Sequence, residues 1–190
     1  MTHPALLDPS AATATAPDTF TVQLDTTQGS IRVDVDRSWA PLGADRFYNL
    51  VTIGYYDDVA FFRVVDGFVA QVGIHGDPAV NKVWKKALIK DDPVVASNAE
   101  GTVTFATSGR DARTTQFFIN YRNNARLDAM GFSAFGKVQD MDVARKLHAG
   151  YGEGAPSGRG PQQGRIHREG NAYLRGGFAQ LDYIRSARVV

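Results

Sequence analysis

Apolar and polar residues alternate along several short segments of the chain, as they do in half-buried β-strands. The segment "FTVQLDTTQGSIRVDV", residues 20–35, alternates on both sides of the polar turn "TTQG" and therefore predicts a β-hairpin. Further strands are predicted by "VAFFRVVDG", "FVAQVGI", "GTVTFATS", "TQFFINY", "GFSAFGKV" and "LDYIRSARVV". With the hairpin, these segments make about eight short strands.

Helical spacing of apolar residues is confined to three segments. Residues 41–53 predict one helix, with Pro41 near its start and Gly54 as its stop. The segment "MDVARKLHAG" is amphipathic and ends at Gly150, and "RIHREGNAYLRG" predicts a short helix. Most strands follow one another directly along the chain, which favours an antiparallel barrel capped by helices over an alternating βαβ sheet.

Composition indicates a single globular unit. The chain has 190 residues, of which 43% are hydrophobic, and this suffices for one sizeable core. Residues 1–18 are rich in Ala, Thr and Pro and predict a flexible N-terminal arm. The folded domain is expected over residues 19–190.

Charge and patterning argue against several classes of partner. The formal net charge is +1 and the basic residues are scattered, so neither nucleic acid nor a membrane surface is expected as a partner. Cysteine is absent, which removes disulfides and thiolate chemistry. The start of the chain lacks the pattern of a signal peptide, so the sequence as it stands predicts a cytoplasmic protein. Export stays an alternative, because an arm of this kind can also follow a signal peptide.

Several motifs do not match a known chemistry. The Gly-rich segment 150–164 lacks the spacing of a nucleotide-binding loop and is interpreted as a surface connection. The four histidines are far apart, so no metal site is expected. The carboxylate pairs at 57–58 and 91–92 lie in turn-like contexts, where such residues more often cap helices or face solvent than catalyse.

Three polar residues lie inside otherwise apolar strands: Arg63, Gln71 and Gln116. Strand periodicity places Gln116 and Phe118 on one face of "TTQFFIN" and the apolar residues between them on the other, core-forming face. Each polar residue has an ordinary explanation, in which Arg63 pairs with a carboxylate and the glutamines satisfy backbone groups. The alternative is that all three face a functional groove.

Three blocks of sequence carry a specific resemblance: "FYNLVTIGYYDDVAFFRVVDGFVAQVG", "GTVTFATSGRDARTTQFFI" and "LDAMGFSAFGKVQDMDVARKL". Their order and spacing resemble the cyclophilins, which are peptidyl-prolyl cis-trans isomerases, and particularly the bacterial members. The resemblance implies a mainly β fold, a closed eight-stranded antiparallel barrel capped by two α-helices, with a substrate groove on its outer face. It also implies an enzyme without a cofactor that acts as a monomer on proline-containing peptides and on unfolded or partly folded client proteins.

The resemblance assigns roles to particular positions. The catalytic arginine of the family falls on Arg63. The other family positions bind substrate, and they fall on Phe68, Val69, Gln71, Ala106, Thr107, Gln116, Phe118, Leu127 and Phe132. All three polar residues that looked misplaced in strands are among these positions.

A few positions depart from the family pattern. Phe62 stands where many members have histidine, Asp66 replaces proline, Val69 replaces methionine and Thr107 replaces asparagine. Arg126 occupies the position at which cyclosporin-sensitive members carry tryptophan, so cyclosporin binding is expected to be weak.

Two other functions are compatible with a barrel of this kind. A binding module would hold proline-containing segments without turnover. The absence of Arg63 or Gln71 would favour this function, but both residues are present. A barrel carrying a small apolar ligand would need interior space. Four bulky residues are expected to fill that space instead: Val103, Phe105, Phe117 and Ile119.

Overall fold

The computed structural model describes residues 1–190 and consists of one nine-stranded sheet with helices around it. The strand order is β3-β9-β1-β2-β8-β6-β7-β5-β4, and every neighbouring pair is antiparallel. The strands are β1 Thr19–Thr26, β2 Gly29–Asp36, β3 Val59–Ala60, β4 Arg63–Val65, β5 Val69–Val72, β6 Thr102–Phe105, β7 Phe117–Asn120, β8 Ala134–Val138 and β9 Tyr183–Val189. The α-helices are α1 Pro41–Thr52, α2 Pro78–Trp84, α3 Met141–Ala144 and α4 Gln163–Gly177.

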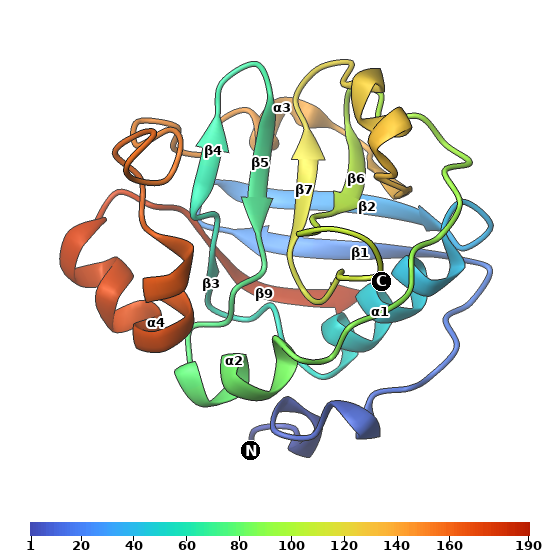
Figure 1. Cartoon of the computed structure of the whole chain (residues 1–190), viewed down its shortest axis with the longest axis horizontal. Helices are drawn as coiled ribbons and strands as arrows, with labels where there is room; N and C mark the ends of the chain where they lie inside the picture. Colours follow the sequence, from blue (N-terminus) through green and yellow to red (C-terminus); the bar gives the residue numbers. More distant parts are fainter.

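The sheet curls so that its two halves face each other. Figure 1 shows β4, β5, β7 and β6 in front of β2, β1 and β9 and crossing them steeply. The main core fills the space between the two layers, and it includes Val103, Phe105, Phe117 and Ile119, all fully or almost fully buried. The interior is therefore packed with side chains, as the bulk of these residues predicted.

The predicted closed eight-stranded barrel is wrong in two respects. There are nine strands, because the segment "VAFFRVVDG" is divided into β3 and β4 at Phe61 and Phe62. The hydrogen-bonded ladder is also open, since β3 and β4 are its two edges. The physical reason is that β3 pairs with β9 and β4 pairs with β5, while only two residues separate β3 from β4. Two strands that continue each other along an extended chain cannot pair side by side.

The helices agree in part with their predictions. The predicted helix at 41–53 is confirmed as α1, whose Phe47 packs against Phe117 and Phe135 in the main core. The amphipathic segment after residue 140 forms only the single turn α3. The predicted short helix near the C-terminus lies within α4, which spans fifteen residues and is kinked at Gly170. The polar segment 75–100 contains α2, which its composition did not predict.

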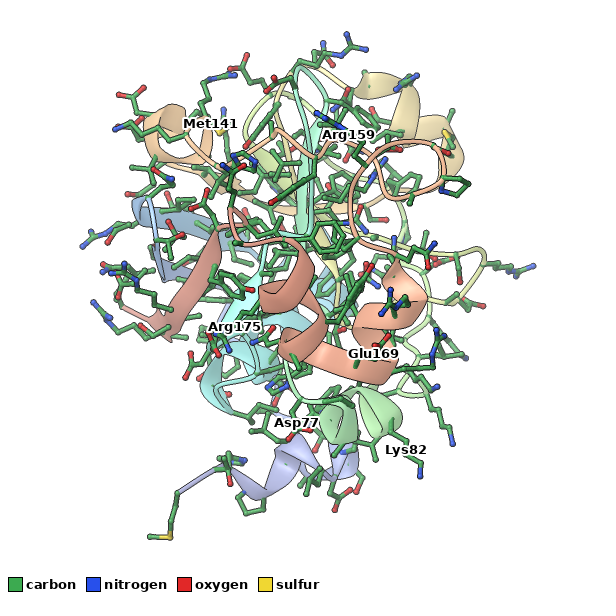
Figure 2. All side chains as sticks on the ribbon, turned by 90° about the vertical axis from the view of Figure 1, so that its left-hand side faces the viewer. Asp77, Lys82, Met141, Arg159, Glu169 and Arg175 are labelled. Carbon is green, nitrogen blue, oxygen red and sulfur yellow. The ribbon has the colours of Figure 1, made fainter.

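α4 covers a second, smaller core at the junction of the two sheet edges. Figure 2 shows α4, with Glu169 and Arg175, lying over this side of the molecule and α2, with Lys82, below it. The second core consists of six buried residues, which are Ala60, Phe62, Ile74, Ile166, Leu174 and Leu181. Phe62, which stands where many family members have histidine, therefore packs beneath α4.

The N-terminal residues 1–18 include two short 3-10 helices, η1 Pro4–Leu6 and η2 Pro9–Ala11. Ala5 and Leu6 are buried in the main core, and Trp84 of α2 donates its indole N–H to their carbonyl oxygens at 3.2 and 3.1 Å. Figure 1 shows this segment below α2 and α1. The flexibility of this arm stays a prediction.

Candidate active site

The register of three strands places the predicted polar and apolar site residues side by side. Arg63 of β4 lies opposite Gln71 of β5, and Gln71 lies opposite Phe118 of β7. Directly opposed residues in an antiparallel sheet project from the same face. Their neighbours Val64, Ala70, Phe117 and Ile119 belong to the main core. Arg63, Gln71 and Phe118 therefore line the outer face of the sheet, as strand periodicity predicted for Phe118.

The guanidinium of Arg63 is hydrogen-bonded from two sides. Its Nη1 donates to Oε1 of Gln71 at 2.8 Å, and Gln71 Nε2 donates onward to Oε1 of Gln116 at 2.9 Å. On the other side, Nε and Nη2 donate to the two carboxylate oxygens of Glu153 at 2.7 and 3.1 Å. Arg63 thus pairs with a carboxylate, as its ordinary explanation predicted, whereas Gln71 and Gln116 bond to side chains and not to the backbone groups expected of them. That the three residues face a functional groove stays a prediction.

An apolar pocket lies beside this hydrogen-bonded line. Its floor is a cluster of three buried residues, Val69, Phe118 and Leu127, with Phe68, Ala106 and Phe132 packed against them. The rings of Phe118 and Phe132 meet edge to face at 5.8 Å. The cavity measures about 270 Å³, and its lining residues are Arg63, Phe68, Val69, Gln71, Ala106, Thr107, Phe118, Leu127, Met130 and Phe132. Nine of the ten residues predicted from the sequence therefore line one cavity, which we call the apolar pocket.

The family model described as "Cyclophilin type peptidyl-prolyl cis-trans isomerase/CLD" matches residues 21–168. The chain belongs to the cyclophilin family. Two similar proteins support this. Peptidyl-prolyl cis-trans isomerase A of Dickeya dadantii is 35% identical over 132 residues, covering 66% of this chain and 70% of the relative. Peptidyl-prolyl cis-trans isomerase-like 3 of Rhizopus delemar is 35% identical over 142 residues, covering 67% and 83%.

Solved structures agree at the level of the fold. The crystal structure of a cyclophilin type peptidyl-prolyl cis-trans isomerase from Cryptosporidium parvum matches with a TM-score of 0.66 and 18% sequence identity, over 90% of this chain and 98% of that one. The mainly β, cyclophilin-like fold predicted from the sequence is thereby confirmed. The family model and the relatives confirm the predicted enzyme class. This cyclophilin is a peptidyl-prolyl cis-trans isomerase.

A second cavity of about 410 Å³ opens beside the apolar pocket and shares Gln71, Ala106 and Thr107 with it. We call it the polar pocket. The structure places the tenth predicted residue, Gln116, here and not in the apolar pocket. Lys85 at the end of α2 and His167 of α4 also line it. Burial, and then the charge of Lys85, lower the pKa of His167, which favours the neutral form of its imidazole.

The segment 75–100, whose role composition did not reveal, supports the apolar pocket from behind. The side-chain amide of Asn98 donates to the backbone oxygen of Phe132 at 2.9 Å and to Asp128 at 2.8 Å. Asp128 belongs to the 3-10 helix η3 Ala125–Met130, which also carries Leu127. The buried side-chain amide of Asn98 therefore fixes the position of Phe132 relative to η3, which carries Leu127.

Arg126 lies over Phe68, one of the residues that line the apolar pocket. Its guanidinium lies 5.2 Å from the ring centre of Phe68, and that of Arg63 lies 5.7 Å from the same ring. Both cations lie over the ring of Phe68, whose negative face attracts them.

Two residues at the site were not anticipated. Met130 lines the apolar pocket from the end of η3, and an isolated methionine in a surface segment carries no sequence signal. Glu153 was missed because its loop was interpreted as a surface connection. A signal did exist: Glu153 is the single acidic residue between positions 150 and 164, and a carboxylate partner was one of the two explanations of Arg63.

Proposed function

We propose that this cyclophilin lowers the barrier to X-Pro rotation by donating a hydrogen bond from Arg63 to the proline nitrogen. Rotation breaks amide resonance over a barrier of ~18–20 kcal/mol. The nitrogen of a planar amide is not an acceptor, but in the twisted transition state it regains its lone pair. A donor aimed at this nitrogen therefore stabilises the transition state and not the ground state.

The hydrogen bonds of Arg63 support this role. A guanidinium has five N–H donors, of which Gln71 and Glu153 accept three. Nη1 and Nη2 each keep one N–H for a substrate. A hydrogen bond from a charged donor is worth ~1.5–3 kcal/mol, which corresponds to roughly 10- to 150-fold in rate. The apolar surroundings must supply the remaining acceleration.

We further propose that the apolar pocket receives the proline ring. Phe118, Leu127 and Phe132 offer aromatic and aliphatic surface on three sides of the cavity. Holding the ring there restricts rotation to one side of the bond, and excluding water favours the less charge-separated twisted amide. The Cryptosporidium parvum isomerase has been crystallised in the presence of the dipeptide Ala-Pro.

The flanking peptide is expected to lie along the backbone at Ala106 and Thr107. The Ala106 N–H donates to the carbonyl oxygen of Gln116 at 2.9 Å, which fixes the backbone at this position, and we propose that the Ala106 carbonyl accepts a substrate N–H. Gln71 and Gln116 face the same stretch of groove. Such contacts suit any extended segment, and we propose proline-containing peptides and unfolded or partly folded proteins as substrates, bound by a monomer.

A protease-coupled assay on an Ala-Pro peptide tests this function. The wild-type protein is expected to accelerate cis-trans exchange. Binding of the peptide without acceleration would contradict the proposal and would identify a holding module instead. The Arg63→Ala variant then tests the assignment of the donor.

Cyclosporin is expected to bind weakly, because Arg126 replaces the tryptophan of sensitive family members and is already stacked on Phe68. A guanidinium cannot supply the apolar surface and indole N–H of that tryptophan. Isothermal titration calorimetry measures the affinity. We expect a dissociation constant above the micromolar range for wild type and tighter binding by Arg126→Trp. A sub-micromolar constant for the wild type would contradict the prediction.

A further inference from the structure

We propose that Glu153 is a positioning residue for isomerisation, which holds the guanidinium of Arg63 so that its remaining N–H groups face the apolar pocket. The inference rests on the proposed role of Arg63. It concerns the Gly-rich loop at residues 150–164, for which the sequence suggested only a connecting role.

The pairing between Glu153 and Arg63 restrains the plane of the guanidinium. Both carboxylate oxygens of Glu153 accept hydrogen bonds, from Nε at 2.7 Å and from Nη2 at 3.1 Å. Gln71 accepts a third from Nη1 at 2.8 Å. An isolated arginine side chain has considerable rotamer freedom. Three acceptors on three different nitrogens remove much of that freedom before a substrate binds, which is preorganisation of the donor.

The loop brings Glu153 to β4 through its backbone. An isolated antiparallel bridge joins Gly152 to Val64, which are the chain neighbours of Glu153 and Arg63 respectively. Gly152 has a φ of 61°, a conformation that residues with a side chain rarely adopt. The two partners of the ion pair are therefore held together by adjacent backbone contacts as well as by their charges.

The glycines on the far side of the loop enclose the backbone of Glu153. The Gly160 N–H donates to the Glu153 carbonyl oxygen at 2.8 Å. A Cβ atom at Gly158 would lie 2.3 Å from that same oxygen, and one at Gly160 would lie 2.8 Å from it. Both distances are shorter than van der Waals contact allows. The absence of side chains at these positions is thus what permits the loop to fold around Glu153, and it explains the glycine content that matched no nucleotide-binding motif.

In the opposite role, Glu153 would compete with the substrate for the N–H groups of Arg63. This role predicts a different effect of removing Glu153 on the rate of isomerisation. Glu153 accepts from Nε and from one N–H of Nη2, and an N–H remains on each terminal nitrogen. The carboxylate and the substrate therefore need not exclude each other. A competing carboxylate would raise activity when it is removed, whereas a positioning carboxylate would lower it.

The test compares Glu153→Ala, Glu153→Asp and wild type. Peptide affinity and the exchange rate of the bound Ala-Pro peptide are measured separately by NMR titration and exchange spectroscopy. We expect Glu153→Ala to lower the rate on the enzyme about three- to ten-fold, a part of the roughly 10- to 150-fold that a charged hydrogen bond supplies. Peptide affinity should change by less than about two-fold, because Glu153 restrains a donor that acts in the transition state. Glu153→Asp, which keeps the charge, should recover part of the rate.

Glu169→Ala is a matched control. The carboxylate of Glu169 accepts hydrogen bonds from Nε and Nη2 of Arg165 at 2.7 and 3.1 Å, the same distances as in the pair of Glu153 with Arg63. The side chains of Glu169 and Glu153 are both 42% exposed. Figure 2 places Glu169 on α4 and Arg159 of the Gly-rich loop above it. Loss of this pair should leave the exchange rate unchanged. An equal loss of rate in Glu169→Ala and Glu153→Ala would overturn the proposal, because it would indicate a general effect of removing a surface carboxylate.

The double variant Arg63→Ala/Glu153→Ala separates this inference from the proposed function. If Glu153 acts through Arg63, the double variant should be no slower than Arg63→Ala alone. Wild-type activity in Arg63→Ala would overturn the proposed function itself. A slow Arg63→Ala together with a wild-type or faster Glu153→Ala would overturn only the role of Glu153. Gly158→Ala offers an independent check and should reproduce the rate loss of Glu153→Ala, while Gly176→Ala, where a Cβ meets nothing within 4 Å, should not.

Discussion

Replacing Arg63 by alanine is expected to lower kcat/KM for an Ala-Pro peptide at least about ten-fold while the fold remains intact. The expected loss follows from the ~1.5–3 kcal/mol of one charged hydrogen bond that exists only in the transition state. Arg63→Lys should also be slow, because an ammonium group cannot keep the bonds to Gln71 and Glu153 and at the same time present a fixed donor. The protease-coupled assay measures both rates.

The fold of Arg63→Ala should survive because the ion pair lies at the surface. The side chains of Arg63 and Glu153 are 24% and 42% exposed, and such pairs contribute up to about 1 kcal/mol to stability. Arg165→Ala is the matched control, since Arg165 also binds a glutamate through two nitrogens and also lies over an aromatic ring, that of Tyr173. Full activity in Arg63→Ala, or an equal loss in Arg165→Ala, would remove Arg63 from the mechanism.

Replacing Asp92 by alanine is expected to destabilise the protein by about 3–5 kcal/mol, the cost of leaving a buried charge without its partner. Asp92 accepts hydrogen bonds from Arg113 Nη2 at 3.1 Å, and both side chains are 4% exposed. It also accepts from the backbone N–H groups of Leu42 and Gly43 at 3.1 and 2.9 Å. Asp92 thus caps the first turn of α1, whose own N-cap residue Ala40 provides no side-chain acceptor.

Thermal unfolding followed by circular dichroism measures this effect. For a domain of this size, 1 kcal/mol corresponds to about 2–4 °C, so Asp92→Ala should lower Tm by roughly 6–20 °C. Asp92→Asn keeps an acceptor for the helix but loses the charge, and an intermediate Tm is expected. The neighbouring Asp91 is exposed and is the control. Equal melting temperatures for Asp91→Ala and Asp92→Ala would contradict the capping role.

Both predictions concern contacts between distant parts of the chain, and the sequence did not predict which residues make these contacts. Turn-like carboxylates such as Asp92 were expected to cap helices or face solvent, and Asp92 does cap a helix. Which helix it caps was not readable, because Asp92 and Gly43 are separated by 49 residues. Likewise, the sequence indicated that Arg63 needed either a carboxylate partner or a groove, but Glu153 lies 90 residues away.

The errors in the predicted fold have the same origin. Alternation located the strand segments well, since a two-residue period is a local property. Closure of the barrel is not a local property. It depends on which strands pair with β3, which contains Val59, and with β4, which contains Arg63. α2 was missed because it is only seven residues long and lies within a polar segment, although Val80, Val83 and Trp84 have helical spacing. Its Trp84 is buried by contact with residues near the N-terminus.

The sequence by itself determined the strand segments, the helix α1 and the family, and it singled out Arg63, Gln71 and Phe118 as candidate groove residues. Each of these depends on local periodicity or on motifs in consecutive residues. The tertiary structure alone decided the open nine-stranded ladder, the cap that Asp92 provides and the position of Glu153 against Arg63. Those features depend on the free energy of contacts between segments far apart in the chain, which no local pattern encodes.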